Sequence, residues 1–294
     1  MNDVFALDSF TVSRQSVEEA DLAALHALSV SVGWPHRAED WQFLRSYGDG
    51  FVAVDASGRV QASAMWFPFG DDFATVGMVI TSPRLQANGG GAWLMQHVLE
   101  QTRGRALGLH ATRAAHRLYR SQGFADEATI YQNQGVLAAP PAARAVTDGT
   151  VRPLLQSDLP DLLALDRRTT GTDRAALLAL LFGQSEAEAY VLHREDGLAA
   201  YALARPFGRG TVIGPVIAKD DDDAISVVMP HLQSRVGTFV RLDTGQTDGP
   251  FAQLLVLSGL TVFDTVTRMS LGRAWPLSSQ PPHRIYAIAA QTIG

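Results

Sequence analysis

The stretch from Gly77 to Leu94, GMVITSPRLQANGGGAWL, decides the fold of this chain. Its apolar start, residues 77–80, predicts a strand, and its end predicts the first turn of an apolar helix. Three consecutive glycines lie at that helix start, although glycine there costs backbone entropy. Their N–H groups can converge on an anion, which the positive end of the helix dipole also favours. The stretch therefore predicts a phosphate-binding loop, and a merely flexible turn is the alternative.

Two common nucleotide-binding motifs do not fit this loop. No Lys-Ser or Lys-Thr pair follows the glycines, as a P-loop requires. No parallel strand carrying an acidic residue follows about 20 residues later, as dinucleotide binding requires. We therefore expect the loop to bind another class of phosphate ligand.

A second segment, ATRAAHRLYRSQGF at residues 111–124, follows the loop after one predicted strand. With the loop, it resembles the GNAT superfamily of N-acetyltransferases over residues 8–136. That family's pyrophosphate loop has the form Gln/Arg-x-x-Gly-x-Gly/Ala, matched here by Gln86, Gly89 and Gly91. Its second motif has the form Asn/Thr-x-x-Ala-x-x-Leu-Tyr-x-x-x-Gly-Phe, and residues 112–124 match it. Thr112 stands where many members have an Asn that contacts the pantetheine arm.

The resemblance implies acetyl-CoA as co-substrate, with no metal. In the family, a backbone amide of a splayed strand polarises the thioester carbonyl, which places that amide near Met78, Val79 or Ile80. The other residues expected to bind the cofactor are Gln86, Ala87, Asn88, Gly89, Gly90, Gly91, Ala92, Thr112 and Ala115. Tyr119 occupies the position of the family's general acid, because a phenol is protonated at neutral pH and can donate to a thiolate. A packing role is the alternative for Tyr119.

The acceptor side is less determined by the sequence. His110, His36 and His116 are candidates for the base that takes a proton from the amine, and a chain of waters or an ordinary structural role is the alternative for each. Trp34, in the loop that usually forms one wall of the acceptor site in this family, can either contact the acceptor or anchor the loop. Asp243 is a further candidate for contacting a charged acceptor, and an interdomain ion pair is its alternative.

The order of predicted elements occurs twice along the chain. Gly77 and Gly123 are 46 residues apart, and Gly214 and Gly259 are 45 apart. We therefore expect an α/β (α+β) fold of two tandem GNAT-like domains, each a mixed, mostly antiparallel central sheet flanked by helices. The expected ranges are a catalytic domain at 1–136, a linker at 137–149 and a degenerate domain at 150–294 that shapes the acceptor site. Two unrelated α/β domains are the alternative.

The second half lacks the chemistry of the first. Four aspartates, residues 220–223, occupy the position of the glycine-rich loop and would repel a pyrophosphate. Leu255 stands in the position of Tyr119. A divalent cation could bind the acidic run, but a solvated helix cap is the simpler interpretation. We expect one working cofactor site in each chain.

Composition limits the classes of protein that this chain can belong to. The 294 residues include no cysteine and carry a net charge of −6 without a long basic stripe, which argues against nucleic-acid binding. No apolar run approaches the roughly 20 residues of a membrane span, and the N-terminus does not read as a signal peptide. We expect a cytoplasmic monomer or homodimer that acetylates a small-molecule or peptide amine. A non-catalytic acyl-CoA sensor or a structural scaffold is the alternative.

Overall fold

A computed structural model describes residues 3–6, 11–86, 88–142, 148–275 and 283–294 of the chain. By their contacts, the residues form two compact units. Unit 1 holds Met1–Leu109, Phe207–Arg209 and Ile293, and unit 2 holds His110–Pro206, Gly210–Thr292 and Gly294.

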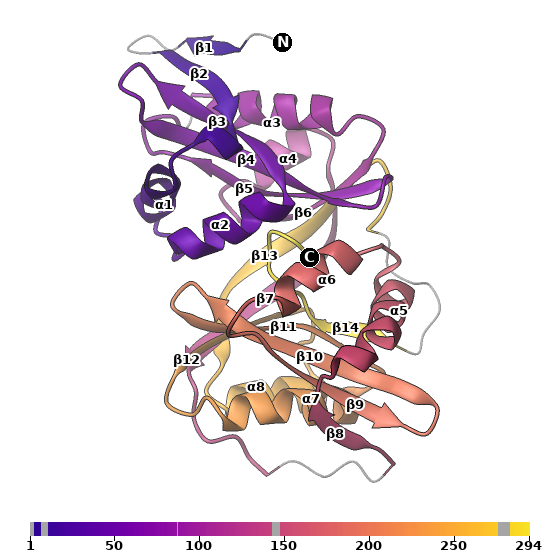
Figure 1. Ribbon diagram of the computed structural model, residues 1–294. Coiled ribbons are helices and arrows are strands. Elements are labelled where there is room, and N and C mark those ends of the chain that lie inside the picture. Colours follow the sequence, from indigo (N-terminus) through magenta and orange to yellow (C-terminus); the bar gives the residue numbers. More distant parts are fainter. Residues whose placement is uncertain (1–2, 7–10, 87, 143–147, 276–282) are drawn as a thin grey trace. The chain divides into compact units, whose positions relative to one another are not determined.

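Unit 1 is built on a mixed sheet with the strand order β1-β2-β3-β4-β5-β6. Every neighbouring pair is antiparallel except β5 and β6, which run parallel. Helices α1 and α2 lie on one face of this sheet and α3 on the other (Figure 1). The elements are β1 (Val4–Ala6), β2 (Thr11–Ser16), α1 (Leu22–Ser31), α2 (Ala38–Tyr47), β3 (Asp49–Asp55), β4 (Val60–Phe69), β5 (Phe73–Thr81), α3 (Gly90–Gln101) and β6 (Ala106–Ala111).

Two successive caps begin the first helical region. Ser16 accepts a hydrogen bond from the Glu18 amide, but it caps only a short 3-10 turn, Val17–Glu19. Asp21 caps α1 itself by accepting from the Ala24 amide at 3.0 Å. The helix therefore starts later than its first cap residue suggests.

In unit 2 the sheet is again mixed, with the strand order β13-β7-β12-β11-β10-β9-β8, and β14 pairs with β11 outside this path. Helices α5 and α6 lie on one face of it and α7 and α8 on the other (Figure 1). The elements are α4 (His116–Ser121), β7 (Ala125–Val136), β8 (Thr150–Pro153), α5 (Leu159–Thr170), α6 (Ala175–Phe182), β9 (Glu188–Arg194), β10 (Gly197–Phe207), β11 (Gly210–Ala218), α7 (Asp221–Gln233), β12 (Phe239–Thr244), α8 (Gly249–Leu257), β13 (Thr261–Leu271) and β14 (Arg284–Ala287). Both sheets are mixed and mostly antiparallel with flanking helices, which confirms the expected fold class.

The last strand of the first repeat, β7, lies between two strands of the second. It pairs antiparallel with β12 from Val136 to Tyr131 and with β13 from Gln134 to Ala125. The compact units therefore differ from the ranges 1–136, 137–149 and 150–294 expected from the sequence. Local periodicity indicates a strand but carries no information on its distant partner.

The start of the expected linker belongs to the core of unit 2. Leu137 is only 2% exposed and packs in the main cluster of that unit. Its amide donates to Thr238 O and its carbonyl accepts from the Gly237 amide, both at 2.9 Å. Residues 143–147, in the middle of the expected linker, lie outside the described residues.

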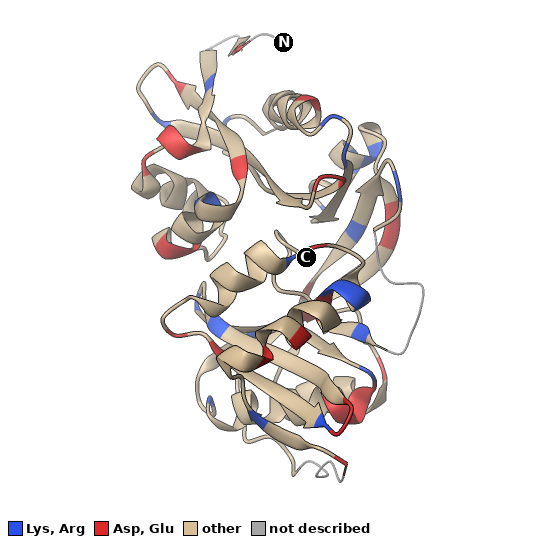
Figure 2. Ribbon diagram, turned by 45° about the vertical axis from the view of Figure 1, so that its right-hand side comes forward, with Lys and Arg blue, Asp and Glu red and all other residues tan. Residues whose placement is uncertain are grey.

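Charged residues of both signs are dispersed over the elements of each unit (Figure 2). No helix in the described part of the chain is long and apolar enough to cross a membrane.

A buried histidine makes the stability of unit 2 depend on pH. His231, on α7, is 0% exposed and its Nε2 lies 3.2 Å from Ala202 O, so Nε2 carries the hydrogen and donates. Burial lowers the pKa of this imidazole to about 4, from an ordinary value near 6.5. The unfolded chain therefore binds the proton more readily, and stability is lost as the pH falls from about 6.5 to 4.

We predict that His231→Gln makes the loss of stability between about pH 6.5 and 4 less steep. The Gln side chain can still donate to Ala202 O but does not titrate, which removes up to about 3 kcal/mol of pH-dependent destabilisation. The measurement is the free energy of urea unfolding at several pH values between 7 and 4. His26→Gln, on α1, is the control for replacing a histidine elsewhere in the chain. The prediction would be contradicted if the free energy of unfolding of His231→Gln fell as steeply with decreasing pH as that of the wild type.

Candidate functional site

The strand β5 is distorted at the residues expected to polarise a thioester. Met78 has a φ of 50°, which is rare for a residue with a side chain. The register with β4 shifts between Ser63 and Met65, so that β5 carries one extra residue there. The Ser63 hydroxyl donates to Met78 O at 2.7 Å and holds the bulge.

The parallel pairing between β5 and β6 ends just before this bulge. Its last registered pair is Val76 with Leu109, although β5 continues to Thr81. In the described chain, residues 77–81 have no registered partner on β6. This gap brings backbone groups of β5 to a place where an extended ligand can pair with them.

The glycine-rich loop leads from the end of β5 into α3, as predicted. Gly89 has a φ of 83°, in the left-handed region, and is the N-cap of the helix without a side-chain cap. The first helical bond runs from the Trp93 amide to Gly89 O at 2.9 Å, so the amides before Trp93 lack an acceptor within the helix. A Cβ on Gly90 would lie 2.7 Å from Leu85 Cδ2. An uncapped helix start of glycines can bind an anionic group.

The polar side chains of the loop stabilise the loop itself. Gln86 Nε2 donates to Thr81 O at 3.0 Å, and Asn88 Nδ2 donates to Arg84 O at 3.2 Å. Ala87 lies outside the described residues, so its expected role has no structural description. Gly91 and Ala92 form the first turn of α3.

The second motif forms the turn and helix that hold Tyr119. Thr112 O accepts from the amides of Ala115 and His116, and Ala115 is the N-cap of α4. Tyr119 is 5% exposed and its ring lies 5.9 Å from that of Phe124. Burial raises the pKa of its phenol above the ordinary value near 10. The phenol therefore stays protonated at neutral pH, as a hydrogen-bond donor must.

His110, at the end of β6, has one ring nitrogen fixed and the other without a partner. Its Nδ1 lies 2.8 Å from Gln291 O, and because a carbonyl only accepts, Nδ1 carries the hydrogen. Burial, together with the charge of Arg268, lowers the pKa of the ring to about 4. Nε2 then bears a lone pair at neutral pH, and it has no hydrogen-bond partner among the described residues.

Trp275, which follows the end of β13, contacts this histidine, and side chains of β7 and β13 contact Trp275 in turn. The Trp275 ring lies 5.1 Å from the His110 ring, and the Arg268 guanidinium lies 5.8 Å from the Trp275 ring centre. Glu127 Oε1 accepts from the Trp275 amide at 2.7 Å, and its Oε2 lies 3.3 Å from Arg268 Nε. Trp275 and Gln291 were not expected from the sequence, because no local motif marks them.

The other expected acceptor residues are engaged within the protein. His36 is 8% exposed, with its Nδ1 3.3 Å from Ser29 Oγ and its ring 5.5 Å from Trp34. This geometry favours an anchoring role for the Trp34 loop. Asp243 is 0% exposed and pairs with Arg241 at 2.6 Å, so its carboxylate is held in an internal ion pair.

The corresponding helix start in the second repeat supplies its own carboxylates. Asp220 caps α7 by accepting from the Asp223 amide at 3.1 Å. Asp221 accepts from the Phe251 amide at 3.1 Å, at the start of α8. Leu255, in the position of Tyr119, is 1% exposed and has no proton to give. No group of three metal-ligating side chains occurs within the described ranges.

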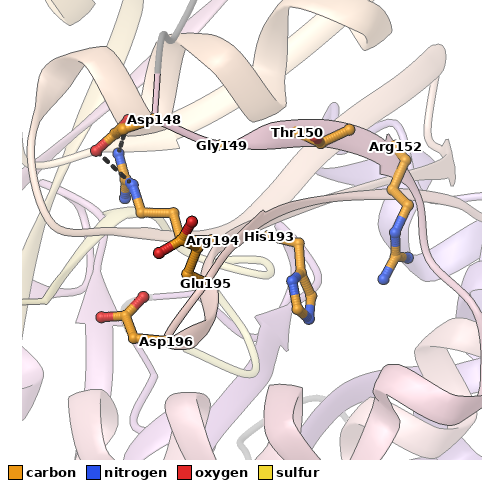
Figure 3. A pocket seen from close by; sticks show the side chains of 8 residues that line it. All are labelled: Asp148, Gly149, Thr150, Arg152, His193, Arg194, Glu195 and Asp196. Atoms are coloured by element: carbon orange, nitrogen blue, oxygen red, sulfur yellow. Dashed lines mark hydrogen bonds and ion pairs between the residues drawn. The ribbon is translucent and has the colours of Figure 1, made fainter.

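A wide depression of about 1070 Å³ lies at the edge strand β8 and its neighbour β9. Figure 3 shows Asp148 paired with Arg194 on one side of it and Arg152 on the other. Arg194 also binds Asp223, and Arg152 binds Asp158 at 2.6 Å. Both arginines are therefore already paired with carboxylates of the chain.

Known proteins resemble both halves of the chain. Residues 19–124 match the acetyltransferase (GNAT) family, and residues 162–287 match an acetyltransferase (GNAT) domain. The uncharacterized N-acetyltransferase YitH of Bacillus subtilis is 24% identical over 95% of this chain and 97% of its own length. The holothin acyltransferase of a Pseudoalteromonas species is 23% identical over 87% of this chain and 88% of its own.

Two solved structures share the whole architecture. A protein from Pyrococcus horikoshii, provisionally assigned as an acetyltransferase, superposes with a TM-score of 0.75 at 16% identity, covering 100% of this chain and 99% of its own. A tandem GNAT protein from the clavulanic acid biosynthesis pathway gives 0.63 at 13% identity, covering 88% and 98%. At these identities, the likeness supports the fold.

The open helix start of α3 gives a direct test of anion binding. We predict that Gly91→Asp weakens CoA binding about tenfold or more, a change of about 1.4 kcal/mol. The new carboxylate suits the helix dipole and should not lower stability, but it repels a pyrophosphate. Isothermal titration calorimetry measures the affinity, with Gly91→Ala as the control for added bulk. Equal affinity in the Asp and Ala variants would argue against an anion at this helix start.

Proposed function

The chain belongs to the GNAT superfamily, with two GNAT domains in tandem, and from this premise we propose that it transfers an acetyl group from acetyl-CoA to a primary amine. The acceptor is a small molecule or a peptide, and the one working cofactor site lies in the first repeat. The observation that carries the proposal is the bulge at Met78 beside the uncapped, glycine-rich start of α3 in the same unit.

In this proposal the first repeat binds and orients the thioester. The amides at the start of α3 hold the pyrophosphate, and Gln86 and Asn88 keep the loop in shape. The divergence of β5 from β6 leaves room for the pantetheine arm along residues 79–81. An amide of the bulge at residues 78–80 polarises the carbonyl and stabilises the oxyanion that forms on it.

The reaction is a direct attack. The amine nitrogen forms a bond to the carbonyl carbon, the C–S bond then breaks, and the sulfur leaves with the bonding electrons. Tyr119 gives the departing sulfur a proton. Its raised pKa makes complete transfer harder than for an ordinary phenol, so the hydrogen bond to the developing thiolate is the larger part of its contribution.

His110 is our candidate for contacting the acceptor. The Gln291 carbonyl fixes the tautomer, so Nε2 can accept a hydrogen bond from the amine and turn the nitrogen lone pair toward the carbonyl. With a pKa of about 4, His110 is a weak base and orients the amine rather than storing its proton. The proton that the amine loses passes to water.

The similarity to a holothin acyltransferase supports a small-molecule acceptor, because that relative covers most of this chain. A non-catalytic acyl-CoA sensor is the second candidate function. It is weaker because a sensor needs neither the bulge nor a buried phenol such as Tyr119.

We predict that Tyr119→Phe lowers kcat about 10- to 100-fold and leaves the KM for acetyl-CoA nearly unchanged. The loss follows from removing one hydrogen bond to the leaving sulfur. Steady-state assays with a thiol reagent measure it, and Tyr131→Phe, on β7, is the control. Full turnover by Tyr119→Phe would remove the proton-donor assignment.

A panel of amines separates the enzyme from the sensor. We expect free thiol to be released from acetyl-CoA with at least one acceptor among polyamines, amino acids, aromatic amines and short peptides. Acetylated product should appear in equal amount by mass spectrometry. Tight CoA binding without turnover across this panel would favour the sensor.

A further inference from the structure

The two repeats contain strands of equal length at the proposed thioester position. Strands β5 and β11 each have nine residues, and their fifth residues are Gly77 and Gly214. Each runs parallel to the next strand only near its start, and β11 pairs with β12 at Thr211 and Val212 alone. Both repeats therefore contain two parallel strands that diverge.

In the second repeat, the gap between these strands is filled by the chain itself. Residues 283–292, here called the C-terminal strap, include β14, which pairs antiparallel with Val216, Ile217 and Ala218. Counting from the two glycines, these residues correspond to Val79, Ile80 and Thr81 of β5. The strap thus follows the course that we propose for the pantetheine arm in the first repeat.

The strap also bonds to the second of the diverging strands. The Ile288 amide donates to Asp243 O at 3.0 Å, and the Thr244 hydroxyl donates to Tyr286 O at 2.5 Å. It therefore bridges β11 and β12 in the way that an extended ligand would bridge them. Residues 286–290 of the strap are buried.

Gly214 allows this close approach. A Cβ at that position would lie 2.0 Å from Ile288 O and 3.0 Å from Ile288 C. Because real Cβ atoms do not come so near to backbone, any larger residue would displace the strap. The glycine shared by the two repeats therefore makes room for the protein's own chain in the second.

The end of the gap at the start of α7 is filled as well. This end corresponds to the start of α3, where we propose that the pyrophosphate binds. The Tyr286 hydroxyl donates to Asp221 Oδ1 at 2.7 Å, and the Tyr286 ring is 0% exposed and packs 5.0 Å from that of Phe251. Asp220 and Asp221 thus put carboxylates at the helix start where the first repeat has bare glycine amides.

We propose that the C-terminal strap is a built-in substitute for acyl-CoA in the second repeat. Its backbone replaces the pantetheine arm along β11, and the Asp220 carboxylate, which accepts from the Asp223 amide, replaces the pyrophosphate at α7. The second repeat consequently takes no acyl-CoA, and its gap serves to anchor the strap. The inference rests on the proposed function for the course of the cofactor along β5.

Anchoring the strap has a consequence for the first repeat's strand β6. Gln291, three residues after Ile288, presents the carbonyl that fixes the tautomer of His110. Arg205 Nη2 donates to Ala289 O at 3.4 Å between these two points. The filled gap therefore positions a group that our proposal assigns to acceptor binding.

Hydrogen exchange on the full chain tests the proposal. Without ligand, the β11 peptide covering residues 216–218 should exchange about tenfold or more slowly than the β5 peptide covering residues 79–81. CoA should slow exchange at 79–81 and leave 216–218 and the strap unchanged. Calorimetry should give one CoA per chain. Fast exchange at 216–218 that CoA slows, or two CoA per chain, would overturn the proposal.

The same experiment separates this inference from the proposed function. If CoA protects neither strand, the cofactor site of the first repeat fails. Slow exchange at 216–218 without ligand would then still establish the strap as the occupant of the second gap, although no longer as a cofactor substitute.

Variants test the role of Gly214. We expect Gly214→Ala to speed exchange at residues 216–218 and 284–288 about tenfold while CoA still binds to the first repeat. Gly245→Ala is the matched control, since the nearest atom to its Cβ is 3.8 Å away. If Gly214→Ala does not fold, Tyr286→Phe, which loses only the bond to Asp221, should speed exchange in the strap. Unchanged exchange in the folded variant would contradict the inference.

Discussion

The divergence of two parallel strands is the constraint on which the rest of each repeat depends. When β5 leaves β6 after Val76, the backbone of β5 loses its partner on one side, and buried amides and carbonyls without partners are costly. The protein meets this cost in two ways. In the first repeat the bulge at Met78 turns the backbone, and we propose that a ligand completes the pairing. In the second repeat β14 completes it from within the chain.

The two helix starts show the same contrast in their electrostatics. At α3 no side chain caps the helix, and glycines allow an anion to approach the bare amides. At α7 the Asp220 carboxylate already accepts from the Asp223 amide, and Asp221 bonds to both Tyr286 and Phe251. A helix start needs an acceptor for its free amides, but that acceptor can be either a ligand or a side chain. The composition of the loop decides which of the two it is.

Local patterns in the sequence predicted the elements that local physics determines. The glycine-rich start of α3, the helix of Tyr119 and the order of strands in both repeats all follow from periodicity, caps and turn residues. The pairing of β7 with β12 and β13 could not be predicted, because it joins residues more than 100 positions apart through backbone bonds, which leave no local side-chain pattern. β14 was missed because its four residues, RIYA, are too few to establish a strand pattern. The environment of His110 depends on that same missed segment.

On our proposal, the duplicated fold explains how a repeat that lacks cofactor chemistry can still contribute to the reaction. Its sheet binds the strap through β11 and β12, and the strap carries the Gln291 carbonyl to His110. Because that carbonyl can only accept, it leaves Nε2 of His110 as the acceptor, and burial keeps the ring neutral at physiological pH. A histidine fixed in this state cannot act as a strong base, but it can orient an amine. On this argument the second repeat contributes geometry to the acceptor side, whereas the first repeat contributes the groups that hold the donor.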